Sequence, residues 1–338
     1  MVEAWYRDAA WLKLLRPLEW LYRGAVARRR RAYASGRKSV QCLPVPVIVV
    51  GNITLGGTGK SPLVAWLGRY LGAQGWRPGI VSRGYGGKAP HYPFHVGMEA
   101  SVDQSGDEPL MLVQQTGLPV VVDPDRPRGA RALIEAGCDI VIADDGLQHL
   151  ALGRDIELVV VDGKRGFGNG RCLPAGPLRE SFSRLNHVDA IVVNGESRKT
   201  LHCANGTKSY QMQLRPAQWR HLVDGVCYPV GRQPFYSPVH ALAGIGHPSR
   251  FFATLEALGV EVREHPLADH HRFSAEDLRF DDELPVVMTA KDAVKCRPFA
   301  HADCWVLDVE ACPQPAFIDW LQTRLETLQS ATREVSNG

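Results

Sequence analysis

A glycine-rich segment, Gly51 to Pro62, carries the strongest chemical signal in this sequence. It lies between an apolar run, Val45 to Val50, and a segment from Ser61 to Ala73 with the composition of a helix. Such a loop can wrap a polyphosphate with its backbone N–H groups, while the positive end of the following helix points at it. Nucleotide binding is therefore predicted for the residues that would line the loop: Thr54, Gly56, Gly57, Thr58, Gly59, Lys60 and Ser61.

Two side chains of this loop would reach the ligands directly. Lys60 would contact the β and γ phosphates as a catalytic cation, and the hydroxyl of Ser61 would ligate Mg²⁺. Thr54 stands where the strict phosphate-loop pattern has glycine, although the two glycines after Leu55 still supply a flexible backbone. Leu55 replaces the lysine that marks membrane-cycling ATPases, which disfavours a switch of that kind. The simpler alternative is a glycine-rich hairpin or helix start without a ligand.

Two adjacent carboxylates end an apolar strand further along the chain. The run Ile140 to Ile142 leads into Asp144 and Asp145, and open α/β proteins bind ligands at the carboxyl edge of the sheet. Carboxylate oxygens and phosphate oxygens are the ligands that Mg²⁺ prefers. We therefore expect the pair to bind Mg²⁺, directly or through water, with Gln148 and His149 as supporting substrate contacts. The alternative is an Asp-Gly turn that only stops the strand.

A second acidic cluster, Asp107 and Glu108, opens an apolar helix. Taken alone, Asp107 could simply cap that helix. If it faces the phosphate loop, it could accept the proton of an attacking hydroxyl, and Glu108 is a further candidate ligand for Mg²⁺. Arg83 follows the second strand and Arg126 the third. Both arginines fall at the expected active edge, where each could bind substrate phosphate or form an ordinary ion pair.

Two later segments carry groups suited to a substrate. The proline-rich loop Cys172 to Glu180 ends in Arg179 and Glu180, which could hold an anionic group or a sugar. The segment Asp269 to Phe273 joins two histidines to an acid, but no further metal ligand accompanies them at a suitable spacing. A catalytic or orienting His270 is therefore preferred over a zinc site, and a purely structural histidine stays open.

These residues need a sheet to bring them together, and the chain between Pro44 and Gly195 has the pattern of one. Continuous apolar runs alternate with helical segments, which is typical of a parallel sheet covered by helices on both faces. We expect an α/β fold, a P-loop NTPase-like parallel sheet sandwiched by helices, with a second smaller α/β domain. The expected divisions are residues 1–40 for a basic amphipathic helix, 41–205 for the phosphate-loop domain and 206–338 for the smaller domain, which would close the cleft.

The composition fits a folded protein. The chain has 338 residues, 45% of them hydrophobic and 22% charged, which excludes a disordered, collagen-like or disulfide-stapled chain. Its eight cysteines form no C-x-x-C pair, so we expect reduced thiols in the cytosol and neither a zinc knuckle nor a disulfide framework. No run approaches the roughly 20 apolar residues that would cross a bilayer. Charged residues interrupt the N-terminus, so no signal peptide is expected.

The first 40 residues differ from the rest in charge. They hold ten Lys and Arg against three Asp and Glu, a local charge of +7, whereas the remainder carries −4. Apolar side chains from Trp11 to Ala25 recur with the period of an amphipathic helix, in which Pro17 predicts a kink. Three tryptophans and the run Arg28 to Arg31 suit the headgroup layer of an anionic membrane. The alternative is a helix packed on its own domain with a solvated arginine tail.

Taken together, these segments resemble the tetraacyldisaccharide 4'-kinase family, the kinases of lipid A assembly. The resemblance covers most of the chain, and the order and joint presence of the motifs make it specific. Ala290 stands where the family's Thr-Glu-Lys-Asp motif has glutamate, so Lys291 and Asp292 are the matching residues there. The segments that carry the resemblance are the basic N-terminal helix, Gly51–Pro62, Ser82–Gly86, Gly106–Pro109, Asp144–His149, Leu173–Glu180, Gly244–Pro248, Asp269–His270 and Thr289–Lys295.

The resemblance implies a kinase that uses ATP and Mg²⁺ to phosphorylate the 4'-hydroxyl of a tetraacyl glucosamine disaccharide 1-phosphate, giving the lipid A precursor lipid IVA. It implies a cleft between two α/β domains in which His270 assists Asp107 as the base. The expected partners are this lipid and the anionic cytosolic face of the inner membrane, bound peripherally, with neither nucleic acid nor an obligate protein partner. The alternatives are a soluble P-loop small-molecule kinase and a membrane-associated ATPase switch.

Overall fold

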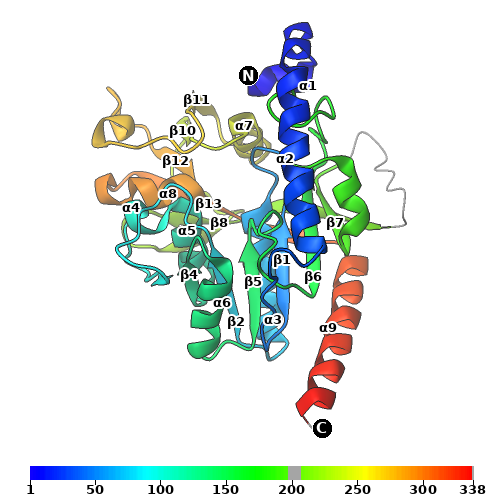
Figure 1. Ribbon diagram of the computed structural model, residues 1–338. Helices are drawn as coiled ribbons and strands as arrows, with labels where there is room; N and C mark the ends of the chain where they lie inside the picture. The colour runs from blue at the N-terminus through cyan, green and yellow to red at the C-terminus, as the bar shows by residue number, and fades with distance from the viewer. Residues whose placement is uncertain (197–206, 337–338) are drawn as a thin grey trace.

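The computed structural model describes residues 1–196 and 207–336, with side chains as far as residue 330. Within these residues a 13-stranded sheet has the order β11-β10-β12-β13-β8-β7-β6-β1-β5-β2-β4-β3, with β9 paired to β8 off this path (Figure 1). The strands are β1 (Val47–Gly51), β2 (Pro78–Ser82), β3 (Phe94–His95), β4 (Val120–Val122), β5 (Ile140–Asp144), β6 (Ile156–Asp162), β7 (Ala190–Asn194), β8 (Lys208–His221), β9 (Cys227–Pro229), β10 (Val239–Ala243), β11 (Val262–Pro266), β12 (Val286–Thr289) and β13 (Cys304–Pro313).

The strands around β1 are buried on both faces, as their continuous apolar sequences predict. β1 pairs in parallel with β5 and β6, and β2, β4 and β7 continue the parallel order. Ile48 and Val50 face one hydrophobic cluster, whereas Val47 and Val49 face another on the opposite side. Both faces of such a sheet have to be covered by helices. The predicted parallel α/β sheet is confirmed.

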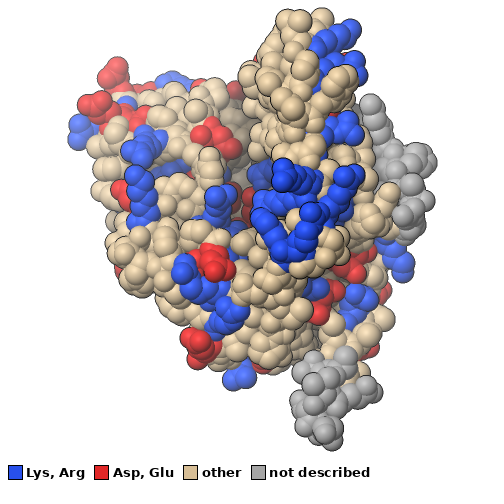
Figure 2. Space-filling view, in the orientation of Figure 1, with Lys and Arg blue, Asp and Glu red and all other residues tan. Residues whose placement is uncertain are grey.

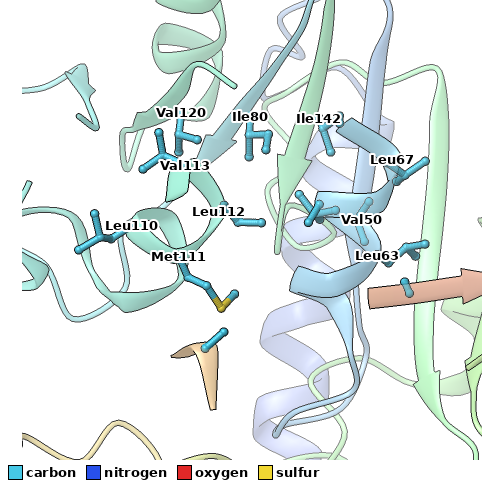
Figure 3. Close-up of a cluster of buried hydrophobic side chains, with 14 of the residues drawn as sticks. Val50, Leu63, Leu67, Ile80, Leu110, Met111, Leu112, Val113, Val120 and Ile142 are labelled. Atoms are coloured by element: carbon cyan, nitrogen blue, oxygen red, sulfur yellow. The ribbon is translucent and has the colours of Figure 1, made fainter. Parts of the chain in front are cut away.

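Helices α3 and α5 cover one face of this part of the sheet, and α6 covers the other. Figure 3 shows Leu63 and Leu67 of α3 and Leu112 of α5 within the first cluster. Leu133 of α6 belongs to the second cluster. The helices are α1 (Val2–Arg7), α2 (Arg16–Ala34), α3 (Lys60–Ala73), α4 (Val102–Ser105), α5 (Asp107–Thr116), α6 (Arg126–Glu135), α7 (Pro248–Ala257), α8 (Ala290–Cys296) and α9 (Pro315–Ser336), with the 3-10 turns η1 (Ala10–Leu15), η2 (Phe182–His187), η3 (Ala275–Leu278) and η4 (Arg297–Phe299).

The 14-residue strand β8 joins the two halves of the chain into one sheet. Its first residues pair in parallel with β7, and the stretch from Met212 to His221 pairs antiparallel with β13. The C-terminal helix α9 returns to the first half, where the rings of Phe317 and Trp66 on α3 have centroids 6.0 Å apart. The expected boundary at residues 205 and 206 lies outside the described residues, and the division into two domains stays a prediction.

The N-terminal segment forms α1, the turn η1 and the 19-residue α2, which carries the N-terminus away from the sheet (Figure 1). Pro17 lies in the first turn of α2, so the predicted kink is wrong. At this position proline favours the start of a helix, because the N–H that it lacks would have no partner within the helix.

Much of the apolar surface of this segment is exposed. Trp5, Leu12 and Glu19 are buried against the body of the molecule. None of the helices in the described part of the chain is both long enough and apolar enough to cross a bilayer. The large apolar side chains that remain exposed here are Met1, Val2, Trp11, Leu14, Leu18, Trp20 and Leu21.

Replacement of Phe317 by Ala is expected to lower the free energy of unfolding by about 3–5 kcal/mol, because its fully buried ring packs α9 onto Trp66 and Tyr210. Urea denaturation followed by circular dichroism measures the loss. Phe299→Ala removes a ring on η4 that is 38% exposed and serves as the control, with an expected cost of about 1 kcal/mol or less. Equal losses in the two variants would contradict the packing described for α9.

Candidate active site

The glycine-rich loop runs from the end of β1 to the start of α3 and is fixed by an amide from β7. Gly59 has a φ of 93° directly before Lys60, the first residue of α3. Only glycine suits this position, because the backbone is left-handed and a β-carbon would collide with the side chain of Asn194. Nδ2 of Asn194 donates to the carbonyl oxygen of Thr58 at 3.0 Å. The turn that would surround a phosphate is therefore held in place by β7.

The first arm of the loop pairs with the segment that precedes Glu180. The N–H of Leu55 donates to the carbonyl of Pro177 at 2.9 Å, and the N–H of Arg179 donates to the carbonyl of Ile53 at 2.7 Å. Thr54 lies between these two bonds and is buried. Because the backbone is paired like a strand here, a β-branched residue fits where the strict pattern has glycine.

Lys60 contacts a carboxylate at the mouth of the loop. Its Nζ lies 3.6 Å from Oδ1 of Asp145, whose Oδ2 accepts a hydrogen bond from Arg179 at 2.8 Å. Burial alone would raise the pKa of Asp145, but Lys60, Arg179 and Arg126 outweigh it and hold the pKa at about 2. Asp145 also has a φ of 47°, a left-handed conformation that costs free energy and is common at functional sites. This ionised carboxylate holds Lys60 and Arg179 at the sheet edge.

Asp144 is fully buried at the end of β5, and neither of its carboxylate oxygens has a hydrogen-bond partner. Burial, Glu108 and Asp145 raise the pKa of Asp144 to about 7, against the attraction of Lys60 and Arg126. Unpartnered buried oxygens among acids fit a bound cation, which would supply the missing partner. No set of three or more His, Cys, Asp or Glu ligands is gathered among the described residues. Where Mg²⁺ binds with a nucleotide, one or two carboxylates usually hold it together with phosphate oxygens and water.

Asp107 and His270 lie together although they are 163 positions apart in the sequence. Nδ1 of His270 donates to Oδ2 of Asp107 at 3.0 Å, and Oδ1 accepts the N–H of Glu108 at 2.9 Å. The N-cap of α5 is Gly106, so the Asp107 side chain is not the cap of its helix. His270 has a φ of 60°, again in the left-handed region. The structure therefore brings the two predicted catalytic residues into direct contact.

Two lysines of α8 surround the same carboxylate. Nζ of Lys295 lies 3.9 Å and Nζ of Lys291 lies 4.0 Å from Oδ2 of Asp107. Burial alone would raise the pKa of Asp107, but the hydrogen bond from His270 and the two lysines outweigh it and lower the pKa. The same hydrogen bond raises the pKa of His270. Asp107 is thus an ionised carboxylate oriented by an imidazole, which is the state in which it can accept a proton.

The Thr289–Lys295 segment forms the start of α8 and ties the site together. Lys291 lies 3.3 Å from both Glu108 and Asp269, so Glu108, a predicted metal ligand, is paired with a lysine. Although burial would lower the pKa of Lys291, these carboxylates outweigh it and raise the pKa. Asp292 is buried and accepts the N–H of Gly244 at 3.0 Å. The two matching residues of this motif therefore organise the carboxylates and the neighbouring loop.

The predicted substrate residues Gln148, Arg179 and Glu180 form one network beside Asp145. Nε2 of Gln148 donates to Oε1 of Glu180 at 2.9 Å and to the carbonyl of Asn52 at 3.0 Å. Glu180 is buried and lies 3.7 Å from Arg184. The network thus connects the base of the phosphate loop to the segment that ends in Glu180.

Helix α2 is fastened to this segment as well. The carboxylate of Glu19 accepts the N–H of Cys172 at 3.0 Å, and the hydroxyl of Tyr22 donates to the carbonyl of Arg179 at 2.8 Å. A cavity of about 360 Å³ lies between α2 and the segment, and Trp20, Arg23 and Arg179 are among the residues that line it. Helix α2 therefore borders the segment that carries Arg179 and Glu180.

The remaining predicted substrate residues occupy supporting or peripheral positions. Arg126 is 2% exposed and donates to the carbonyl oxygen of Asp144 at 2.9 Å, while burial lowers its pKa to about 10. Burial and the charge of Arg126 lower the pKa of His149 to about 4, so its imidazole is neutral. Arg83 is exposed after β2. Substrate contacts of Arg83, Arg126 and His149 stay predictions, and for Arg126 the burial favours a role in supporting the end of β5.

Two further elements contact the phosphate loop: Asn194, for which no role is predicted above, and the segment Gly244–Pro248, which is named there only as part of the family resemblance. Asn194 holds the phosphate loop, and its Oδ1 accepts a hydrogen bond from Arg250 at 2.9 Å. A β-carbon on Gly246 would lie 2.8 Å from the backbone nitrogen of Gly57, so the Gly244–Pro248 segment touches the loop. A polar residue directly after an apolar strand marks Asn194 as it marks Asp144, and this signal could have found it.

Comparison with known proteins finds relatives over nearly the whole chain. Residues 11–326 match the family model described as tetraacyldisaccharide-1-P 4'-kinase. The chain is 51% identical over 329 residues to a tetraacyldisaccharide 4'-kinase of Pseudomonas paraeruginosa, covering 97% of each chain. It is 50% identical over 333 residues to one of Azotobacter vinelandii, covering 98% of each. The crystal structure of LpxK from Aquifex aeolicus in complex with ATP aligns with a TM-score of 0.79 at 27% identity, over 94% of this chain and 99% of that one.

The hydrogen bond with Asp107 raises the pKa of His270, so Asp107→Asn is expected to lower it and to leave less positive charge on the imidazole at neutral pH. A pH titration of the histidine NMR signals measures the change, with His270→Gln to assign the resonance. Asp277→Asn, which alters the neighbour of His271 instead, is the matched control. A His270 pKa that is unchanged in Asp107→Asn, or lowered equally in both variants, would contradict the pairing.

Proposed function

Because the chain belongs to the tetraacyldisaccharide 4'-kinase family, we propose that its phosphate loop holds ATP while Asp107 receives the proton of the attacking hydroxyl. The protein is a lipid A 4'-kinase that uses ATP and Mg²⁺ and whose acceptor is the 4'-hydroxyl of an acylated disaccharide 1-phosphate. Membership of this family does not support the two alternatives, an ATPase switch and a kinase of small soluble substrates.

The observation that carries the assignment of Asp107 is its 3.0 Å hydrogen bond with His270. Catalysis of phosphoryl transfer rests mainly on position and on electrostatic stabilisation, so a base has to be aligned with the acceptor rather than be strong. The lowered pKa keeps Asp107 ionised and able to take the proton. His270 fixes the orientation of the carboxylate, and we assign it the assisting role.

Backbone N–H groups of the phosphate loop, from Gly56 to Gly59, and the ammonium group of Lys60 would hold the phosphates of ATP. Asp144 fits Mg²⁺ as a ligand because both of its carboxylate oxygens lack a partner. Ser61 would be the second ligand because it follows Lys60 in the phosphate loop. Asp145 and Glu108 would act at a greater distance because both already pair with cations. When bound, Mg²⁺ neutralises charge on the phosphates.

The cavity between α2 and the Cys172–Glu180 segment supports a site for the disaccharide headgroup. Arg23 and Arg179 offer cations to the 1-phosphate, and Trp20 offers an apolar wall. Arginine suits phosphate because its planar guanidinium binds two oxygens at once. Glu180 lines the same cavity, and Gln148, which donates to Glu180, would support its contact with the sugar.

Asp107→Ala and His270→Ala are expected to lower kcat by about 10²–10⁴-fold with little change in the KM for ATP, because Asp107 would accept the proton of the acceptor hydroxyl and His270 would orient Asp107. Lys60→Ala is expected to lower kcat and to raise the KM for ATP, since this lysine would contact the nucleotide. Transfer of the labelled γ-phosphate to lipid substrate dispersed in detergent micelles measures both constants.

Lys88→Ala, which removes an exposed lysine after β2, is the control for a general loss of positive charge. If the Asp107 and His270 variants kept the normal kcat and changed only the KM for ATP, the proton-accepting role would be wrong.

We further propose that α1, η1 and α2 rest on the anionic cytosolic face of the inner membrane. Seven large apolar side chains between Met1 and Leu21 are exposed, and a surface of this kind marks an interaction site. Figure 2 shows basic side chains gathered over the lower half of α2, whose sequence contains Arg28 to Arg31. Withdrawing an acyl chain from the bilayer costs about 0.8 kcal/mol per CH₂ group, so an enzyme with a tetraacylated substrate gains by binding where the substrate lies.

The variant Leu14→Glu/Leu18→Glu/Leu21→Glu is expected to lose most of its binding to vesicles that contain anionic lipid, because it places charge on the apolar face that would enter the headgroup layer. Co-sedimentation with phosphatidylglycerol-containing vesicles measures the bound fraction. Val223→Glu/Val226→Glu changes exposed valines elsewhere on the surface and is the matched control. Unchanged binding of the triple variant would rule out this face as the membrane contact.

A further inference from the structure

A cation outside the predicted site lies beside the phosphate loop. Arg165 follows β6, and a β-carbon built on Gly56 would lie 3.5 Å from its Nη1 atom. Gly57, the next residue of the loop, is exposed, so the bend formed by the two glycines can be reached from solvent. Lys60 approaches the loop from the start of α3, where Asp145 holds it. Arg165 therefore provides a second positive charge to the loop from a different strand.

The backbone of Arg165 is fixed at the sheet edge. Its N–H donates to Oδ1 of Asp162 at 2.9 Å, and the N–H of Gly166 donates to the carbonyl of Asp162 at 2.7 Å. Asp162 ends β6, which pairs directly with β1, the strand that leads into the phosphate loop. The loop and Arg165 thus leave neighbouring strands at the same edge.

The guanidinium of Arg165 is held by the N-terminal helix. It lies over the ring of Tyr6 on α1, 5.1 Å from the ring centroid. Within the part of the chain that the structure describes, this guanidinium forms no ion pair, and the Asp162 carboxylate faces Arg250 at 3.5 Å instead. An arginine that is stacked but not neutralised keeps its N–H groups available for an anion.

Helix α1 is itself docked on the segment that contains Arg165. Trp5 is buried, its Nε1 donates to the carbonyl of Pro174 at 3.0 Å, and its carbonyl accepts the N–H of Asn169 at 3.0 Å. Tyr6 is the next residue, so docking of Trp5 sets the position of the ring under Arg165. The place of this cation therefore depends on the N-terminal segment.

We propose that Arg165 contacts the transferred phosphoryl group and that Tyr6 is its positioning residue. In the transfer, the 4'-oxygen bonds to the γ-phosphorus as the bond to the β–γ bridging oxygen breaks, the proton passes to Asp107 and the bonding electrons leave with ADP. Negative charge spreads over the oxygens of the group in transit, and a guanidinium beside it stabilises that state. The proposal rests on the proposed placement of ATP in the phosphate loop.

Steady-state kinetics with lipid substrate in detergent micelles test the role of Arg165. Arg165→Ala is expected to lower kcat by about 10²–10³-fold while the KM for ATP changes little, and Arg165→Lys is expected to recover only part of the loss. Lys164→Ala, the exposed neighbour, is the matched control for charge. A normal kcat in Arg165→Ala, or a raised KM for ATP with kcat kept, would overturn the proposal.

A double-variant comparison tests the role of Tyr6. Tyr6→Leu is expected to lower kcat, Tyr6→Phe to recover it because the ring remains, and Tyr6→Leu/Arg165→Ala to be no worse than Arg165→Ala alone. Additive losses would overturn the positioning role. Lys60→Ala distinguishes failure of the proposed ATP placement from failure of the Arg165 proposal. If Lys60→Ala stays fully active, the placement of ATP in the phosphate loop is wrong. If Lys60→Ala loses activity and Arg165→Ala keeps it, only the role of Arg165 is rejected.

Discussion

The site depends on one hydrogen bond between residues from opposite halves of the chain, His270 and Asp107. An acid buried at the start of α5 would favour its neutral form, and a neutral carboxyl could not accept a proton. The packing of α5 on α8 brings Lys291 and Lys295 to the same group, and these charges with His270 keep it ionised. The fold has to hold both halves together for the proposed base, Asp107, to be ionised.

The neighbouring carboxylates Asp144 and Asp145 show how local environment separates chemical roles. They are adjacent in sequence, yet the pKa of one is raised to about 7 and that of the other lowered to about 2. Asp145 turns toward Lys60 and Arg179, whereas Asp144 points into the protein with no partner for its oxygens. Asp145 is neutralised by protein cations, whereas Asp144 keeps two unpartnered oxygens, which is why we propose it as a ligand of Mg²⁺.

The sequence predicts those parts of the site whose residues lie close together within one short segment. The phosphate loop and Asp144 are visible because an apolar strand leads directly into the functional residue, and the sheet then places both at one edge. The Asn194–Thr58 hydrogen bond, the Tyr6–Arg165 contact and the Asp107–His270 hydrogen bond are different, because each joins segments far apart in sequence, and no spacing rule predicts such a contact. The role of His270 comes from the family resemblance, because the segment Asp269 to Phe273 taken alone is also compatible with a purely structural histidine. Pro17 was misjudged because one proline can bend a helix or begin it, depending on where the preceding turn ends.

The long strand β8 limits how the two halves of the chain can move relative to each other. It is hydrogen-bonded to β7 at one end and to β13 along the rest, so a rotation of one half against the other would have to twist or tear a continuous ladder. Proteins that close by a hinge concentrate the motion in a few residues of a flexible connection, and a paired strand is a poor one. Closure of the cleft by residues 206–338, which stays a prediction, would therefore have to bend β8 together with its partner β13.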